Sequence, residues 1–270
     1  MLTQLEDLAA QIDDGASIIM PKGEAPDTPL ALIHEVIRQG RKGLHIVTLP
    51  ACANPVSGMA VDMMIGSGCV SSIETSGVSL GEIGAAPQFG AAVREGRIAI
   101  TDATCPALYA AVQAGGKGQP FTTLRGLIGS DIERHRADYR VIDNPFQPGD
   151  PVVVIKAINP DIAIFHAQAA DRNGNIWIGR NRDLLYASHA AERTLVTVEE
   201  LRDEDFFADD TIAAGVLPSA YVSALAHVPG GARTGIAGAV ADHVARYRQA
   251  ARTDEGFAAW MADAVPEIAA

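Results

Sequence analysis

Apolar residues near the N-terminus recur every three or four positions, which predicts an amphipathic helix. The pair Asp14-Gly15 ends this pattern, and the apolar run 17–20 predicts the first strand. The spacing at 29–39 predicts a second helix, ending at Gly40, before a strand at 44–49. The positions that carry the first helical pattern are Leu2, Leu5, Leu8, Ala9 and Ile12.

Short apolar runs continue along the chain, with helical or glycine-rich segments between most of them. Because strands that alternate with helices build parallel sheets, we predict an α/β fold with a mainly parallel sheet covered by helices. An Asn-Gly pair within 171–175, between two apolar runs, predicts one antiparallel hairpin in addition. The later predicted strands are 70–75, 98–101, 152–155, 162–166 and 194–198.

The chain shows no break that would separate two domains. The turn-forming stretch 143–150 leads directly into a strand, so we interpret it as an internal loop. The segment 253–264 starts with acidic residues and carries Phe257, Trp260 and Met261, as a capping helix would. We therefore predict one domain over residues 1–270, with a C-terminal helical tail from about residue 250.

Composition supports this fold class and narrows the possible ligands. With 48% hydrophobic residues and only 7 phenylalanines, the core must consist mainly of Ala, Val, Ile and Leu, which is typical of parallel sheets. The net charge is −12 and the basic residues are scattered, so we expect no nucleic-acid partner. A local group of Lys and Arg could still bind an anion.

The remaining composition points to a reducing compartment. The widely spaced Cys52, Cys69 and Cys105 form no disulfide framework or C-x-x-C motif, and the histidines show no metal-ligand spacing. The N-terminus lacks the pattern of a signal peptide, and no apolar run reaches membrane-spanning length. We therefore expect a cytoplasmic protein with no membrane association and no bound metal.

A glutamate between glycines is the strongest candidate for chemistry. Glu82 lies between Gly81 and Gly84, just after the predicted strand 70–75. Loops at the carboxyl ends of parallel strands are where α/β sheets bind ligands, and acyl transfer combines a carboxylate nucleophile with backbone N–H donors. A plain strand-to-helix turn gives the same pattern, so both interpretations stay open.

The order of motifs resembles the A (α) subunits of family I CoA-transferases, particularly the glutaconate CoA-transferase type. The resemblance covers residues from about 12 to 200 and the tail helix. The matching segments are 14–18, 37–40 with 44–48, 63–70, 79–89 with 95–98, 119–121, 142–149 and 165–171.

The resemblance implies the sheet architecture that this family shares with sugar-phosphate isomerases, and a B-type partner chain in an AB or A2B2 assembly. It also implies transfer of CoA from an acyl-CoA to a carboxylic acid, in particular a dicarboxylic one, through a glutamyl-CoA thioester. The acyl-CoA is then a substrate, and no tightly bound cofactor is expected. In this family the main glutamate nucleophile belongs to the B-type chain, and Glu82 occupies the matching loop of the A-type chain.

Two segments depart from the family pattern. The glycine-rich loop expected after the first strand contains Lys22 and Gly23 here, which could contact an anion or remain solvated. A related branch hydrolyses ring-opened steroid CoA thioesters with a glutamate of its A-type chain, and Cys105 takes the corresponding position. The resemblance therefore does not support that hydrolase mechanism. Cys105 itself could be a reactive thiol or, more commonly, a small buried apolar residue.

Two further residues are candidates for substrate or CoA binding. Arg125, beside Gly126, lies where the hydrolase branch also has an arginine, and its guanidinium suits a carboxylate or phosphate. A surface ion pair would explain Arg125 equally well. His166 ends a predicted strand, where histidines are usually hydrogen-bonded structural residues, with ligand contact as the alternative.

Two other functions remain open at this point. One is a CoA-dependent hydrolase of a ring-opened or branched acyl-CoA, which would need water in place of an acceptor acid. The other is a non-catalytic ligand-binding module, because one sheet architecture can serve unrelated functions. The chain carries no DNA-binding helix-turn-helix pattern that would favour a sensing module of that kind.

Overall fold

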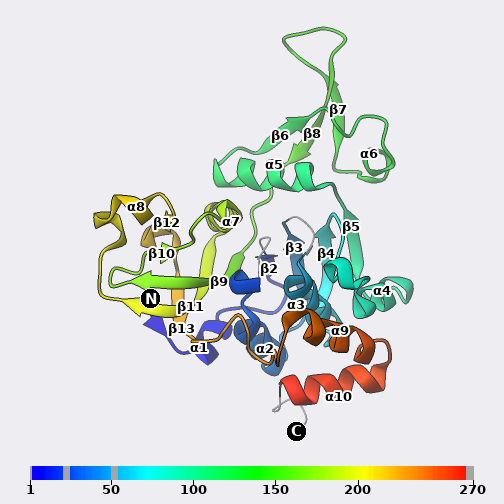
Figure 1. The fold of residues 1–270 in the computed structure, drawn as a ribbon. Helices are drawn as coiled ribbons and strands as arrows, with labels where there is room; N and C mark the ends of the chain where they lie inside the picture. Colours follow the sequence, from blue (N-terminus) through cyan, green and yellow to red (C-terminus); the bar gives the residue numbers. More distant parts are fainter. Residues whose placement is uncertain (1, 21–24, 50–53, 266–270) are drawn as a thin grey trace.

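A parallel sheet forms the centre of the protein, as Figure 1 shows. The structure, a computed structural model, describes residues 2–20, 25–49 and 54–265. Eight strands lie side by side in this sheet, and every neighbouring pair is parallel. Their order is β1 (Leu2–Thr3), β13 (Ala224–His227), β11 (Arg193–Arg202), β9 (Ile162–Asp171), β2 (Ser17–Met20), β3 (Leu44–Thr48), β4 (Val70–Thr75) and β5 (Ala99–Asp102).

Helices cover both faces of this sheet, so successive strand residues are buried on opposite sides. Ile18 of β2 packs with one group of helices and Ile19 with the other, and both side chains are fully buried. On the first face lie α1 (Leu5–Ala9), α2 (Leu30–Arg38) and α3 (Pro55–Gly66). On the second lie α5 (Cys105–Gly116) and α7 (Arg182–Ala190). The predicted α/β fold with a mainly parallel, covered sheet is confirmed.

The Asn-Gly signal marks an antiparallel hairpin, as predicted. Strand β10 (Ile176–Trp177) folds back on the end of β9 and also pairs with β12 (Val216–Leu217). The Asp171 carboxylate accepts the backbone N–H groups of Asn173 and Asn175 and so holds the turn. The short helical segments nearby are η3 (Phe206–Ala208), α8 (Asp210–Ala213) and η4 (Ser219–Tyr221).

A separate antiparallel sheet corrects one prediction. The predicted strand 152–155 does not join the parallel sheet; it belongs to β8 (Pro151–Lys156), which pairs on one edge with β6 (Phe121–Leu124) and on the other with β7 (Arg140–Asp143). The reason is α5, which has two apolar faces. Leu108 and Val112 pack on the parallel sheet, while Ala107 and Ala111 receive the small sheet.

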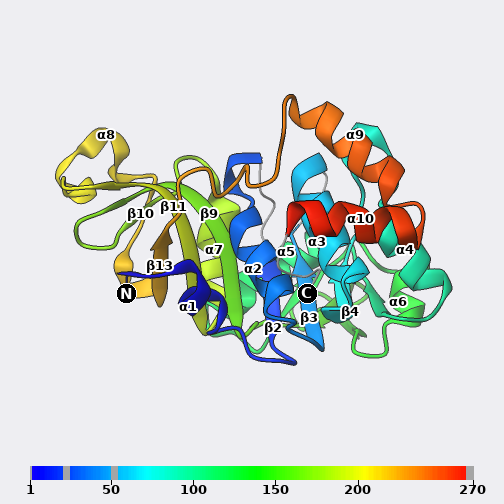
Figure 2. The ribbon, with the colours of Figure 1, turned by 90° about the horizontal axis from the view of Figure 1, so that it is seen from below.

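The N-terminal end differs from the sequence pattern, whereas the helix predicted at 253–264 is present as α10 (Asp254–Ala264). The N-terminal helix begins at Leu5, because Leu2 and Thr3 pair with β13 and the Leu2 side chain is exposed. The helical C-terminal part begins before residue 250, with α9 (Val240–Ala250), and continues with α10. Figure 2 shows α9 and α10 beside α3 and α4 (Pro87–Arg94). None of the helices in the described ranges is long and apolar enough to cross a membrane.

A buried carboxylate joins the C-terminal helices to the main body. Asp62 of α3 is fully buried and accepts hydrogen bonds from the Tyr247 hydroxyl at 2.7 Å and the Phe89 backbone N–H at 2.6 Å. Beside it, the Gln88 side chain donates to the carbonyl of Ala251. Burial raises the pKa of Asp62 to about 6, although these hydrogen bonds oppose the shift.

The raised pKa of Asp62 gives a testable pH dependence. Because the folded-state pKa lies above the ordinary value of 3.8, this carboxyl group stabilises the fold most below about pH 4, and that contribution is lost as the pH rises through about 6. We expect the free energy of unfolding of the wild type, relative to Asp62→Asn, to rise by about 2–3 kcal/mol from pH 7 to pH 4. Urea unfolding at several pH values measures this difference; parallel curves for the two proteins would contradict it.

Candidate functional site

The carboxyl ends of β3, β4 and β5 bring polar side chains together at one edge of the parallel sheet. Thr48 and Thr75 end neighbouring strands, and their buried hydroxyl oxygens lie 2.6 Å apart. The Thr75 hydroxyl also accepts the backbone N–H of Gly77 at 3.0 Å. This edge is where ligands bind in open α/β sheets.

Cys105 lies at this edge and is partly exposed. It is the first residue of α5, and its sulfur lies 3.1 Å from the Ser76 hydroxyl oxygen. Cys69, in contrast, is buried, and burial raises the pKa of its thiol to about 11. Cys105 therefore makes a polar contact, whereas Cys69 is buried like a small apolar residue. Cys52 lies outside the described residues.

A polar cavity of about 440 Å³ is lined by residues of the short helix η1 (Ala25–Asp27), of α5 and of the start of α7. Tyr109 lies one turn after Cys105 on α5 and donates a hydrogen bond to the Asp183 carboxylate at 2.5 Å. Burial and the neighbouring Asp183 raise the pKa of Tyr109, so its hydroxyl stays protonated. The cavity is lined by Pro26, Asp27, Tyr109, Ile178, Arg180, Asn181, Arg182 and Asp183.

This cavity combines cations with hydrogen-bonding groups. Asn181 caps the start of α7, and its side-chain amide donates to the Asp27 carboxylate at 2.7 Å. Arg180 and Arg182 are exposed on the cavity wall, where a guanidinium can bind a carboxylate with two hydrogen bonds. Sequence reasoning did not identify any residue of this cavity. The four-residue spacing of Cys105 and Tyr109 places both on one face of α5 and could have pointed to Tyr109.

Glu82 lies in a tight loop, apart from this cavity's walls. It is the exposed middle residue of the short helix η2 (Gly81–Ile83), which follows β4. The backbone N–H of Leu80 bonds to the carbonyl of Gly84 at 2.8 Å and closes the loop. Gly84 has a φ of 126°, and a side chain there would lie 3.1 Å from the Arg248 guanidinium of α9. The loop is thus a fixed turn that presents Glu82 to solvent.

Arg125 has an intramolecular partner. Its guanidinium forms a two-pronged ion pair with Asp150, with Nε 3.0 Å from Oδ1 and Nη2 2.5 Å from Oδ2. Arg125 and Gly126 follow β6 in the small sheet. The ion pair between Arg125 and Asp150 holds the loop between β7 and β8. The structure thus contains the surface ion pair, and anion binding by Arg125 or Gly126 stays a prediction.

His166 is buried on β9 with partners for both ring nitrogens. Its Nδ1 lies 2.9 Å from the Thr197 hydroxyl, and its Nε2 lies 3.3 Å from a carboxylate oxygen of Glu199. Burial lowers the pKa of His166, although Glu199 opposes this shift. A side chain at Gly231 would lie only 2.9 Å from the ring. These contacts link two central strands to a loop, and ligand binding by His166 stays a prediction.

The sequence-based candidates therefore lie on separate elements. Gly81, Glu82 and Gly84 share one loop, while Arg125 with Gly126 and His166 lie elsewhere in the fold. Lys22 and Gly23 lie outside the described residues. Among the residues that the structure describes, no three His, Cys, Asp or Glu side chains are arranged to hold a metal ion.

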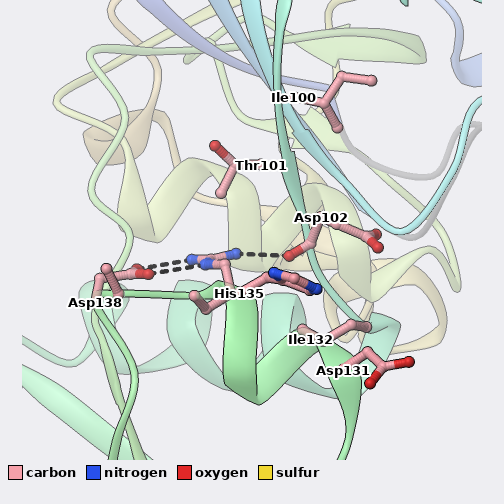
Figure 3. Close-up of a pocket in the computed structure, with 9 residues that line it drawn as sticks. Ile100, Thr101, Asp102, Asp131, Ile132, His135 and Asp138 are labelled. Atoms are coloured by element: carbon pink, nitrogen blue, oxygen red, sulfur yellow. Dashed lines mark hydrogen bonds and ion pairs between the residues drawn. The ribbon is translucent and has the colours of Figure 1, made fainter.

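A larger cavity, of about 570 Å³, lies at the edge strand β5 (Figure 3). Ile100 and Asp102 of β5 line one side, and His135 of α6 (Asp131–His135) lines the other. Arg136 also lines this cavity and donates to the Asp102 carbonyl and to the carboxylates of Glu74 and Asp138. Arg136 therefore holds the small sheet against the parallel sheet, and this cavity borders the joint between them.

The chain is similar to known proteins over most of its length. A model of the family described as Coenzyme A transferase matches residues 2–224. The chain is also 32% identical to the A-type chain of 3-oxoadipate CoA-transferase from Pseudomonas knackmussii, over 97% of this chain and 92% of that one. The chain belongs to the coenzyme A transferase family. The resemblance seen in the sequence motifs is thereby confirmed.

Two other relatives of this chain differ from each other in how much of their own length the chain covers. The A-type chain of glutaconate CoA-transferase from Acidaminococcus fermentans is 27% identical over 99% of this chain and 88% of its own length. An uncharacterized protein of Archaeoglobus fulgidus is 30% identical over 83% of this chain, which covers only 50% of that protein.

Solved structures agree with this assignment. The glutaconate CoA-transferase structure has a TM-score of 0.79 at 27% identity, covering 96% of this chain and 86% of that one. A variant of the decarboxylase AibA/AibB also has a TM-score of 0.79, at 28% identity over 97% and 96% of the two chains. An acyl-CoA transferase of E. coli O157:H7 shares the fold, with a TM-score of 0.66 and 14% identity, over 84% of this chain and 47% of that one.

The Arg136 contacts can be tested by comparing two arginines. Arg136 is only 10% exposed and pairs with Glu74, so Arg136→Ala leaves a largely buried carboxylate without its cation. We expect this change to lower the melting temperature by about 5 °C or more. Arg134→Ala removes the exposed ion pair with Asp131 and should change it by less than about 2 °C. Differential scanning calorimetry checks both, and equal shifts would contradict the role of Arg136.

Proposed function

We propose that this chain is the A-type subunit of a CoA-transferase that moves CoA from an acyl-CoA to a dicarboxylic acid, together with a B-type subunit. The near full-length relation to the A-type chain of 3-oxoadipate CoA-transferase supports this most directly. Glutaconate and 3-oxoadipate, the acids in the two relatives' names, are both dicarboxylic. The polar cavity with Arg180 and Arg182 suits the same class of acid.

The proposed reaction runs in two matching halves. A carboxylate nucleophile attacks the thioester carbonyl, which forms an acyl anhydride and releases the CoA thiolate. The thiolate then attacks the enzyme's carbonyl, so that the free acid leaves and an enzyme–CoA thioester remains. The acceptor acid reverses both steps and leaves as the new acyl-CoA. Transient negative charge at each carbonyl oxygen needs nearby N–H donors.

The two subunits would divide these tasks. The main nucleophile belongs to the B-type chain by the family resemblance, while Glu82 faces solvent in the A-type chain on a fixed loop. Glu82 is therefore proposed as a residue that borders the pocket or the partner. The cavity at Tyr109 and Asp183 is proposed to receive the distal carboxylate of the acid, with Arg182 as its cation.

Because a decarboxylase has a similar structure, the test must identify the reaction products. Hydrolysis would release free CoA without any acceptor acid, and decarboxylation would release carbon dioxide and keep the thioester. CoA transfer alone requires an acceptor and conserves the total thioester. Product analysis with and without acceptor therefore separates the three reactions.

A transfer assay tests the proposed division of labour. We expect the chain and a co-expressed B-type chain from the same genome to transfer CoA from succinyl-CoA to a dicarboxylic acid, while either chain alone is inactive. The Glu82→Gln variant of the pair should retain kcat within about tenfold, because a missing nucleophile would cost far more. Chromatography of the CoA thioesters measures the rates.

Three results would contradict this proposal. Activity in the isolated chain that Glu82→Gln abolishes would make Glu82 the nucleophile. Free CoA as the main product without acceptor would indicate a hydrolase. Release of carbon dioxide from the free carboxylate of the acyl chain, with the thioester intact, would indicate a decarboxylase.

Arg182 provides a separate test of the acid site. Because Arg182 would bind only the distal carboxylate, Arg182→Gln should raise the KM for a dicarboxylic acceptor about tenfold and leave the KM for acetate nearly unchanged. Arg252→Gln, which changes an exposed arginine after α9, serves as the charge-matched control. If Arg182→Gln changed the KM for both acceptors equally, the proposal that this cavity binds the distal carboxylate would be wrong.

A further inference from the structure

The polar cavity between η1, α5 and the start of α7 carries charges of both signs, and neutral groups hold both of its carboxylates. The Asp183 carboxylate of α7 accepts the Tyr109 hydroxyl of α5 at 2.5 Å. The Asp27 carboxylate of η1 accepts the side-chain amide of Asn181 at 2.7 Å. Because a phenol and an amide carry no charge, these two contacts hold the anions without using a cation of the cavity.

Arg182 lies beside Asp183 in the sequence but does not pair with it. Arg182 is exposed on the cavity wall and, within the described part of the chain, forms no ion pair. It is the first residue of α7, where the helix dipole disfavours a cation and favours an anion. A carboxylate that enters the cavity is therefore attracted by the guanidinium of Arg182, which can donate two hydrogen bonds to it.

The direction in which Asp183 points decides how much of this attraction remains. A carboxylate that is not held turns toward a nearby cation, and a guanidinium is the strongest partner it can find. The charge of Asp183 also repels a second carboxylate in the same partly buried space. The Tyr109 hydroxyl directs the Asp183 carboxylate toward α5 and so limits both effects.

We propose that Tyr109 is a positioning residue for the acid substrate, because its hydroxyl holds the Asp183 carboxylate against α5 and leaves Arg182 available to the distal carboxylate. This inference rests on the proposed function, since it concerns the cavity that we assign to the acid. It makes Tyr109 and Asp183 determinants of specificity for dicarboxylic acids. A monocarboxylic acid has no second carboxylate for Arg182, so its binding does not depend on Tyr109.

A purely structural role of the same contact predicts a different result. Helices α5 and α7 already pack through apolar side chains, among them Leu108, Val112 and Ala187. If the Tyr109 hydroxyl only joined these helices, its removal would loosen the cavity and weaken the binding of every acid alike. The charge of Asp183 would then have no influence on affinity.

The experiment measures the binding of two acids to the complex of this chain with its B-type chain by isothermal titration calorimetry. The acids are glutarate and valerate, which have five carbons each and differ in the second carboxylate. Tyr109→Phe removes only the hydroxyl and should raise the Kd for glutarate about tenfold, with the Kd for valerate unchanged. Tyr221→Phe, which changes an exposed tyrosine outside the cavity lining, is the matched control and should change neither Kd.

Asp183→Asn tests the charge itself, because it keeps the shape of the side chain. It should lower the Kd for glutarate about threefold and leave the Kd for valerate unchanged. In the double variant with Tyr109→Phe, the Kd for glutarate should return to within about twofold of Asp183→Asn, since no charge remains for the hydroxyl to hold. Asp183→Asn decides the question even if Tyr109→Phe does not fold: an unchanged Kd for glutarate would reject the positioning role.

The outcomes separate this role from the proposed function. Equal losses of glutarate and valerate binding in Tyr109→Phe, or no recovery in the double variant, would overturn the positioning role. CoA transfer to glutarate with an unchanged KM in Tyr109→Phe would also overturn it, while the proposed function stands. The expected set of Kd values in a complex that never transfers CoA would support the positioning role and reject the function.

Discussion

Burial of both faces of the parallel sheet is the constraint on which the rest of the structure depends. The adjacent residues Ile18 and Ile19 point to opposite faces, and neither is exposed. A strand enclosed in this way cannot hold an unpaired polar group without a large cost in free energy. Several buried polar side chains of the strands accordingly pair with one another, such as Thr48 with Thr75 and His166 with Thr197. The buried hydroxyl oxygen of Thr194 on β11 is an exception, with no hydrogen-bond partner among the described residues.

The carboxyl ends of the strands are where this constraint relaxes. The contacts of Ser76 with Cys105 and of Tyr109 with Asp183 lie at the ends of β4 and β5 and along the next helix. Hydroxyl, thiol and carboxylate groups can meet there because the backbone turns away from the closed layers. Arg180 and Arg182, at the start of α7, lie on the wall of the polar cavity that we propose as the acid site.

The small sheet depends on a second, local contact. Helix α5 is narrow on one side because Ala107 and Ala111 allow Val153 and Ile155 to approach. Arg136 then ties this sheet to β4 and β5 through Glu74 and the Asp102 carbonyl. Helix and ion pairs together hold a projecting hairpin in a defined orientation. The projection explains how a chain with a well-filled core can still expose Phe121, Ile142 and Phe146.

Periodicity and composition by themselves determined the parallel core, because apolar runs at 17–20, 44–49, 70–75 and 162–166 can be buried on both faces only between helices. The Asn-Gly pair likewise determined the hairpin after β9, since its cause is local backbone geometry. Only the tertiary structure decided that 152–155 joins a separate sheet, because strand partners lie far apart in sequence and periodicity does not name them. The partners of Arg125 and His166, and the meeting of Tyr109 with Asp183, were decided in the same way: a side chain's role depends on which distant group the fold brings within hydrogen-bond reach.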